Sequence, residues 1–91
     1  MARYAIEFSP GARRQFRKLP EDAKRRVAKA VDALAAAPRP FGAEKLSGEE
    51  NTYRIPAGDY RVLYDVSDRV LLVLVIRIGH RGDVYRRRAT R

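Results

Sequence analysis

The sequence predicts a small α+β domain with the order β-α-α-β-β-β, in which an antiparallel sheet packs on two N-terminal helices and a basic tail follows. Two observations predict this fold. Apolar residues alternate with period two near the N-terminus and again in the second half, and helical spacing lies between these regions. A length of 91 residues fits one domain, because a second core would need roughly another 50 to 100 residues. The hydrophobic fraction of 45% is sufficient for a packed core.

The first strand is expected at about residues 3–8, where apolar side chains occupy every second position. Ser9 can then cap a helix, and Pro10 suits the first helical position because its missing N–H costs nothing there. This first helix is expected to be short and to run to about Lys18.

A second helix is expected from Pro20 to about Ala37. Glu21 and Asp22 favour its positive N-terminal end, and Pro38 disfavours helical geometry in the residue before it. Its apolar stripe consists of Ala23, Val27, Ala30, Val31 and Leu34, and its basic face of Lys24, Arg25, Arg26 and Lys29. The stripe should pack on the sheet, leaving the basic face in solvent.

The second half of the chain predicts a loop over residues 41–51 and then three strands, at about 53–56, 60–66 and 70–78. A turn is expected at Ala57-Gly58, because glycine tolerates a positive φ. The middle strand alternates as a half-buried strand does. The last is apolar at nearly every position, which is typical of a central strand covered on both sides.

Charge is the strongest compositional signal. The 20 basic and 11 acidic residues give a net charge of +9 and a pI near 10.6. Residues 1–44 carry ten basic and five acidic groups, residues 45–76 four and five, and residues 77–91 six and one. Genome composition could account for the preference for Arg over Lys, but not for the net charge. A polyanion partner is therefore the leading expectation.

Several classes of protein are excluded or disfavoured. The chain has no cysteine and one histidine, so disulfides, thiol nucleophiles and cysteine metal clusters are excluded. We expect neither a metal site nor a cofactor. The N-terminus lacks the apolar core of a signal peptide, and the longest apolar run, Val70–Ile76, is far shorter than the roughly 20 residues that span a bilayer. A cytoplasmic location without a membrane partner is expected.

Arg54 and Arg61 are the first candidate site residues, and their relation depends on the turn between them. A two-residue loop at Ala57-Gly58 would place Arg61 directly opposite Arg54, an unfavourable pair unless an anion lies between the two. A three-residue loop would place Tyr60 opposite Arg54 instead. A plain solvated face is the third possibility.

The end of the last strand supplies the second group of candidates. Its basic residues are Arg77, Arg81, Arg86, Arg87 and Arg88. Tyr85 could stack on a base or exchange a proton, and His80 is an acid or base candidate because its ordinary pKa is near neutrality. The alternative is that Tyr85 packs back on the sheet while His80 and the arginines are ordinary surface residues.

Motifs in these strands resemble the RelE/ParE superfamily of bacterial type II toxin–antitoxin toxins, and the RelE branch most closely. The motifs are Tyr53–Ile55, Gly58–Tyr64, Val75–Arg81 and Val84–Tyr85. The similarity covers almost the whole chain, from the first strand and Ser9-Pro10 through Lys18–Pro20 and Lys45–Gly48. It implies the RelE fold, which is that of small microbial ribonucleases.

The resemblance also implies an activity: a RelE-type toxin enters the ribosomal A site and cuts mRNA there without a metal, using the RNA 2′-hydroxyl as nucleophile. Arg61 and Arg81 match the arginines that neutralise the phosphate, and Arg54 matches a family lysine. Tyr85 matches a tyrosine that stacks on a base and is a candidate general base. Pro56 stands where some members have a second lysine. The RNA-binding residues expected beside these are Lys45, Arg77, Arg86 and Arg87.

The resemblance implies partners as well. They are the ribosome with its mRNA and an acidic, RelB-like antitoxin, for which the basic helix face and tail would be the docking surface. Two other functions stay open on the sequence alone. One is a ParE-like toxin that inhibits DNA gyrase without RNA cleavage, and the other is a simple nucleic-acid-binding domain.

Overall fold

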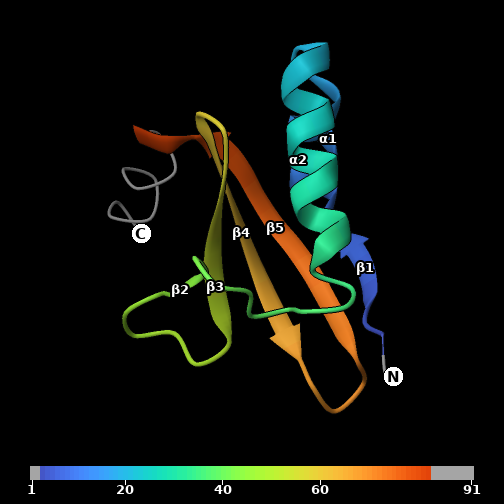
Figure 1. The fold of residues 1–91 in the computed structure, drawn as a ribbon, viewed down its shortest axis with the longest axis vertical. Coiled ribbons are helices and arrows are strands. Elements are labelled where there is room, and N and C mark those ends of the chain that lie inside the picture. Colours follow the sequence, from blue (N-terminus) through green and yellow to red (C-terminus); the bar gives the residue numbers. More distant parts are fainter. Residues whose placement is uncertain (1–2, 83–91) are drawn as a thin grey trace.

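The structure is a computed structural model that describes residues 3–82 of the chain. Its elements in chain order are β1 (Ala5–Phe8), α1 (Pro10–Arg17), α2 (Glu21–Ala33), β2 (Glu44–Lys45), β3 (Thr52–Ala57), β4 (Tyr60–Ser67) and β5 (Leu72–His80). Both helices lie on one side of a five-stranded sheet (Figure 1). The expected α+β class and the order of the main elements are confirmed.

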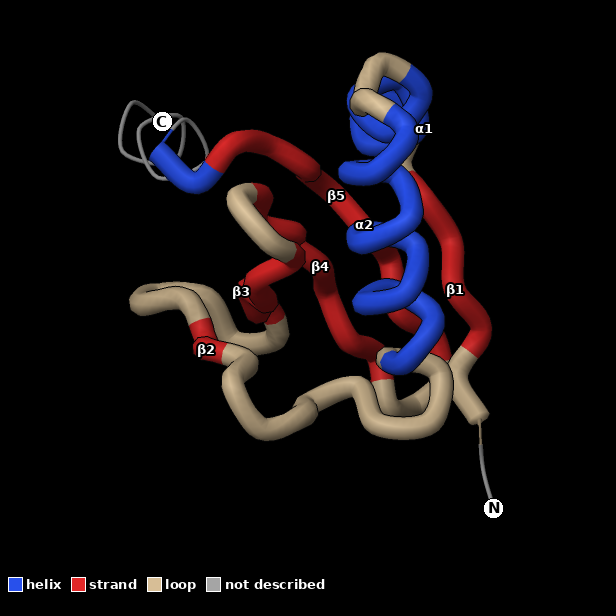
Figure 2. Tube along the Cα trace, turned by 45° about the horizontal axis from the view of Figure 1, so that its top comes forward, coloured by secondary structure: helices blue, strands red, loops and turns tan. Residues whose placement is uncertain are grey.

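The strand order in the sheet is β1-β5-β4-β3-β2, and the sheet is mixed rather than antiparallel throughout. β1 joins β5 in parallel, and every other neighbouring pair is antiparallel. Figure 2 shows β1 at the edge beside the helices and β2 at the opposite edge. Alternation within a strand does not reveal which edge it joins, so the parallel pairing was not predictable from the pattern.

Two further expectations about the sheet are corrected. β2 has only two residues, too few for any alternation, and it falls inside the segment predicted as loop. β5 is central, but its two faces differ: Val73 and Val75 are completely buried under the helices, whereas Leu72 and Leu74 are only partly buried. Its opposite face is therefore not covered by a second layer.

The helices begin where the sequence predicts. The Ser9 hydroxyl accepts a hydrogen bond of 3.1 Å from the Ala12 N–H, and Pro10 is the first helical residue. α2 ends at Ala33, four residues before the predicted end. The N–H groups of Leu34 and Ala35 bond carbonyls three residues back, at 3.0 and 3.1 Å, and this tighter winding ends the regular helix.

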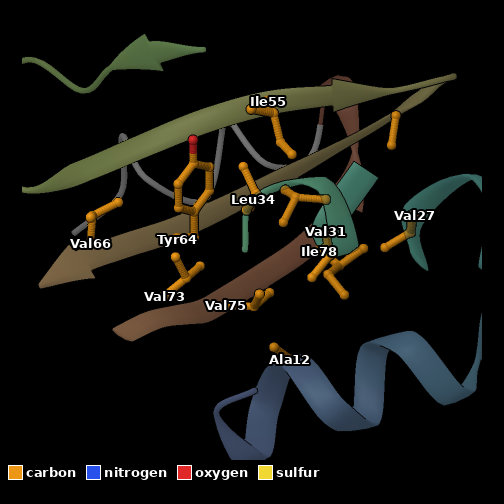
Figure 3. Close-up of a cluster of buried hydrophobic side chains, with 12 residues drawn as sticks. Ala12, Val27, Val31, Leu34, Ile55, Tyr64, Val66, Val73, Val75 and Ile78 are labelled. Carbon is orange, nitrogen blue, oxygen red and sulfur yellow. The ribbon is translucent and has the colours of Figure 1, made fainter. Parts of the chain in front are cut away.

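The core lies between the helices and the sheet, and Figure 3 shows side chains from both layers pointing toward one another. Its completely buried members include Leu34, Val62 and Tyr64. The Tyr64 hydroxyl donates a hydrogen bond of 2.8 Å to the Pro38 carbonyl, and burial raises the pKa of Tyr64 to about 12. The phenol thus stays neutral in the core and holds the segment after α2 against the sheet.

Arg39 fixes the same segment from outside. Its guanidinium donates to both carboxylate oxygens of Asp68, at 3.2 and 2.8 Å, and its Nε donates to the Tyr53 hydroxyl at 3.0 Å. The Tyr4 hydroxyl also donates to Asp68, at 2.5 Å. Three parts of the chain therefore meet at the Asp68 carboxylate, and Arg39 links β3 to them through Tyr53.

Asp68→Asn should make stability less dependent on acid pH. Hydrogen bonds from Arg39 and then Tyr4 lower the pKa of Asp68 below its ordinary value. A carboxylate with a lowered folded pKa stabilises the native state above its unfolded pKa of about 4, and this contribution is lost as the pH falls through the folded pKa. In urea unfolding at pH 6 and pH 3, the advantage of wild type over the variant should shrink at pH 3. An equal advantage at both values would contradict this account.

Candidate functional site

The candidate site is the sheet face opposite the helices, hereafter the open face. Cross-strand pairing aligns Arg54 of β3 with Leu63 of β4, and Leu63 with Arg77 of β5. Leu63 packs with Leu46 and Ile76 in a small apolar cluster separate from the main core. The open face thus has an apolar centre with an arginine on each side of it.

The β3–β4 turn takes neither of the two registers considered for it. Ala57 pairs with Tyr60, so the turn residues are Gly58 and Asp59, and Arg61 lies opposite Pro56. Gly58 has φ +65°, and a Cβ there would lie 3.0 Å from Cδ of Arg26. Glycine is therefore favoured at the first turn position, because it adopts a positive φ without strain. Arg61 consequently lies diagonal to Arg54 rather than directly opposite it.

Arg61 borders a pocket of about 130 Å³ whose other lining residues are Gly42, Glu44, Arg54 and Pro56. Its Nη1 donates hydrogen bonds to the carbonyls of Tyr60 and Gly58, at 2.9 and 3.2 Å. These bonds orient the guanidinium at the pocket. A fixed cation beside a concavity of this size suits a phosphate group.

Arg54 forms an ion pair with Glu44, which lies directly across from it on β2. The Arg54 side chain is 19% exposed and that of Glu44 is 65% exposed. Within residues 3–82, Glu44 is the only acidic residue that lines the pocket. The sequence does not reveal it, because the pattern predicts a loop over residues 41–51 and assigns the carboxylate to no sheet face.

Arg81 is brought to the same end of the sheet as Arg61. Its N–H donates to the Asp59 carbonyl at 3.1 Å, which ties the end of β5 to the β3–β4 turn. Arg61 itself pairs with Gly79, two residues before Arg81. The structure therefore joins two of the predicted phosphate-binding residues across β4 and β5.

Two other predicted site residues, His80 and Lys45, lie on the helix side of the sheet. His80 pairs with Tyr60, and their rings meet edge to face with centroids 5.7 Å apart. It alternates with Gly79 and so lies on the helix side of the sheet rather than the open face. Lys45 pairs with Tyr53, also on the helix side. Tyr85, Arg86, Arg87 and Arg88 lie outside the described residues.

Comparison with known proteins identifies the family. Residues 6–85 match the family described as the ParE toxin of type II toxin-antitoxin system, parDE. The chain belongs to the RelE/ParE superfamily of toxins. The RelG toxin of Mycobacterium tuberculosis is 33% identical over 85 residues, which cover 92% of this chain and 98% of that protein. The mRNA interferase toxin RelE of Escherichia coli K12 is 31% identical over 86 residues, 90% of each chain.

Solved structures agree with this RelE/ParE membership. The toxin–antitoxin complex RelBE2 of Mycobacterium tuberculosis matches with a TM-score of 0.77 and 28% identity, over 87% of this chain and 99% of that one. The isolated Escherichia coli RelE toxin matches with a TM-score of 0.77 and 27% identity, over 96% of both chains. This chain is thus a type II toxin with a RelE fold, and its structural neighbours include toxins bound to antitoxins.

In this RelE/ParE toxin, residues 3–82 contain no group of three or more His, Cys, Asp or Glu side chains that could hold a metal ion. Within the same residues, no helix is long and apolar enough to cross a membrane. Among the described residues, the charged groups that line the small pocket on the open face are the guanidinium groups of Arg54 and Arg61 and the carboxylate of Glu44.

Proposed function

We propose that this toxin is a ribosome-dependent mRNA endonuclease that cuts mRNA in the A site by attack of the RNA 2′-hydroxyl on the adjacent phosphate. The observation that carries the proposal is the pocket on the open face. There Arg61 is held by two backbone carbonyls, and Arg81 is tied to the same turn. The name of its relative, an mRNA interferase, supports the same activity.

The proposed chemistry requires three things: removal of the 2′-hydroxyl proton, stabilisation of negative charge on the phosphorane, and protonation of the leaving 5′-oxygen. Arginine stays protonated at any physiological pH, so it stabilises charge well but exchanges protons poorly. We assign phosphate neutralisation to Arg61 and Arg81, with Arg54 on the adjoining wall of the pocket.

Proton transfer then falls to another group, and we assign it to Tyr85. Its ordinary pKa of about 10 is too high for a base at neutral pH, so it needs positive surroundings such as Arg81 and Arg86 would supply. His80 is the second candidate, although its position beside Tyr60 lies off the open face. Arg77, Arg86, Arg87 and Lys45 are assigned to RNA binding outside the reacting centre. The reaction needs no cofactor.

The proposed partners follow from charge and from the family. The target is the ribosome with its mRNA, which places the activity in the cytoplasm. The neutralising partner is an acidic antitoxin of the RelB type, as in the complexes of the structural neighbours. Its docking surface includes the basic face of α2, where Lys24, Arg25, Arg26 and Lys29 project.

A ParE-like action on DNA gyrase is the second candidate, because residues 6–85 match the family described as a ParE toxin. Two assays separate the candidates. In a cell-free translation reaction, toeprinting should show mRNA cut at the A-site codon of the stalled ribosome, and gyrase supercoiling should be unaffected. Intact message together with inhibited supercoiling would overturn the proposal in favour of gyrase.

A further inference from the structure

One contact on the open face has no place in the proposed cleavage chemistry, namely the ion pair between Glu44 and Arg54. It lies in the pocket that Arg61 also lines, where the proposed function needs positive charge. Carboxylates and phosphates present similar oxygen acceptors to a guanidinium. The Glu44 carboxylate therefore takes from Arg54 the kind of interaction that an RNA phosphate would make.

The geometry makes this pairing specific rather than accidental. Glu44 and Arg54 are direct cross-strand partners in the β2–β3 ladder, so the backbone register sets their side chains on the same face. Arg54 is mostly buried while Glu44 is mostly exposed. The cation is thus fixed in the wall of the pocket, and the carboxylate covers it from the solvent side.

The strand that carries the carboxylate is weakly attached. β2 has two residues and pairs only with β3, at the edge of the sheet. Gly42, with φ +99°, lies just before it. Short edge segments open at low free-energy cost because few contacts hold them. The Glu44 side chain, which is 65% exposed, can therefore rotate off Arg54 while Leu46, the next residue after β2, stays buried beside Leu63.

We propose that Glu44 is a built-in competitor of RNA phosphate at Arg54, a specificity-determining residue of the cleavage site. The inference rests on the proposed function and adds the regulation of that same site. In the free toxin Glu44 neutralises Arg54, so isolated RNA must displace the carboxylate and binds weakly. On the ribosome, additional contacts hold the message in place, and phosphate can displace Glu44. The toxin thereby discriminates ribosome-bound mRNA from free RNA.

A double-mutant cycle tests the competition. The probe is a fluorescein-labelled single-stranded RNA with 2′-O-methyl groups, which cannot be cut through the 2′-hydroxyl. Its affinity is measured by fluorescence anisotropy for wild type, Glu44→Gln, Arg54→Ala and the double variant. Glu44→Gln should bind about fivefold more tightly, the equivalent of an ion pair worth about 1 kcal/mol. Arg54→Ala should cost about fivefold more affinity in the Glu44→Gln background than in wild type.

Glu7→Gln is the matched control, because Glu7 lies on the other edge strand, β1, at an exposed position. This variant makes the same change in net charge as Glu44→Gln and should leave the affinity for the RNA probe within about twofold of wild type. The proposal is overturned if Glu44→Gln binds no more tightly than Glu7→Gln, or if its gain persists undiminished in the double variant. The latter result would indicate a long-range charge effect without competition at Arg54.

The experiments distinguish a failure of the role proposed for Glu44 from a failure of the proposed nuclease function. If toeprinting shows A-site cleavage but the effects of Glu44→Gln and Arg54→Ala on RNA affinity are additive, the role of Glu44 is overturned and the proposed function stands. Coupled variants without any mRNA cleavage would support competition for phosphate while overturning the nuclease assignment. If none of the proteins, Glu44→Gln included, binds the RNA probe, the competition at Arg54 is overturned, and toeprinting on the ribosome alone decides the nuclease assignment.

Discussion

Arg61→Ala should abolish growth arrest when the toxin is expressed in bacteria, and A-site cleavage in toeprinting should fall by at least about 100-fold. The reason is electrostatic: the guanidinium is already oriented by the carbonyls of Tyr60 and Gly58, and a fixed cation at a developing phosphorane charge contributes about 3 kcal/mol or more to catalysis. Arg81→Ala should have the same effect, since a hydrogen bond to the β3–β4 turn holds Arg81 at the same end of the sheet as Arg61.

Arg69→Ala is the control for that experiment. Arg69 is exposed in the turn between β4 and β5, and its removal changes the net charge by the same amount as removing Arg61. Growth arrest should persist in this variant. The unfolding free energy of all three variants should stay within about 1 kcal/mol of wild type, because the arginines lie outside the core. Undiminished toxicity of Arg61→Ala and Arg81→Ala would remove the proposed site.

Leu34→Ala should lower the free energy of unfolding by about 3 kcal/mol, the largest effect expected on stability. Leu34 is completely buried where the chain leaves α2, and it belongs to the cluster between the helices and the sheet. Deleting its branched end removes buried apolar surface and leaves a cavity, which costs about 2 to 5 kcal/mol in well-packed cores. The midpoint of thermal unfolding should fall by about 15 °C in a domain of this size.

Leu71→Ala provides the same substitution at a site without a cavity. Leu71 is 38% exposed in the turn before β5. The backbone there has a positive φ of 53°, which strains leucine and alanine alike. Its removal should cost less than about 1 kcal/mol. Urea unfolding monitored by circular dichroism measures both variants, and equal losses would show that Leu34 does not sit in a tightly packed core.

Local sequence signals predicted most of the fold because they act over a few residues. Ser9 caps α1 through its own side chain, and the stripe that contains Val27 and Val31 is buried as its spacing indicates. Non-local features were beyond such signals. The parallel pairing of β1 depends on which edge of the sheet is free to pair with it. β2 forms because its two residues pair with Arg54 and Tyr53 of β3.

In the candidate site, too, local sequence signals predict some features, whereas others depend on strand pairing between distant parts of the chain. The sequence left open whether Arg54 and Arg61 share a sheet face, because a two-residue turn places them on one face and a three-residue turn on opposite faces. The observed turn has two residues, and its register depended on a single residue. Gly58 occupies the first turn position rather than the second, which shifts Arg61 opposite Pro56. Glu44 could not be assigned at all, since a carboxylate in a predicted loop has no defined face.

The central position of β5 has a consequence for the order in which a ribosome makes this protein. Among the residues that the structure describes, β5 is the last strand synthesised, yet it separates β1 from β4 and supplies the only pairing that β1 has. A nascent chain without β5 leaves its first strand unpaired and its hydrophobic layer open. Arg61 and Arg81 are also brought to the same end of the sheet by the pairing of β4 with β5 and the hydrogen bond from the Arg81 N–H to the Asp59 carbonyl. The described part of the site can therefore form only after β5 has left the exit tunnel, which on the proposed function delays activity against the ribosome that is translating the toxin.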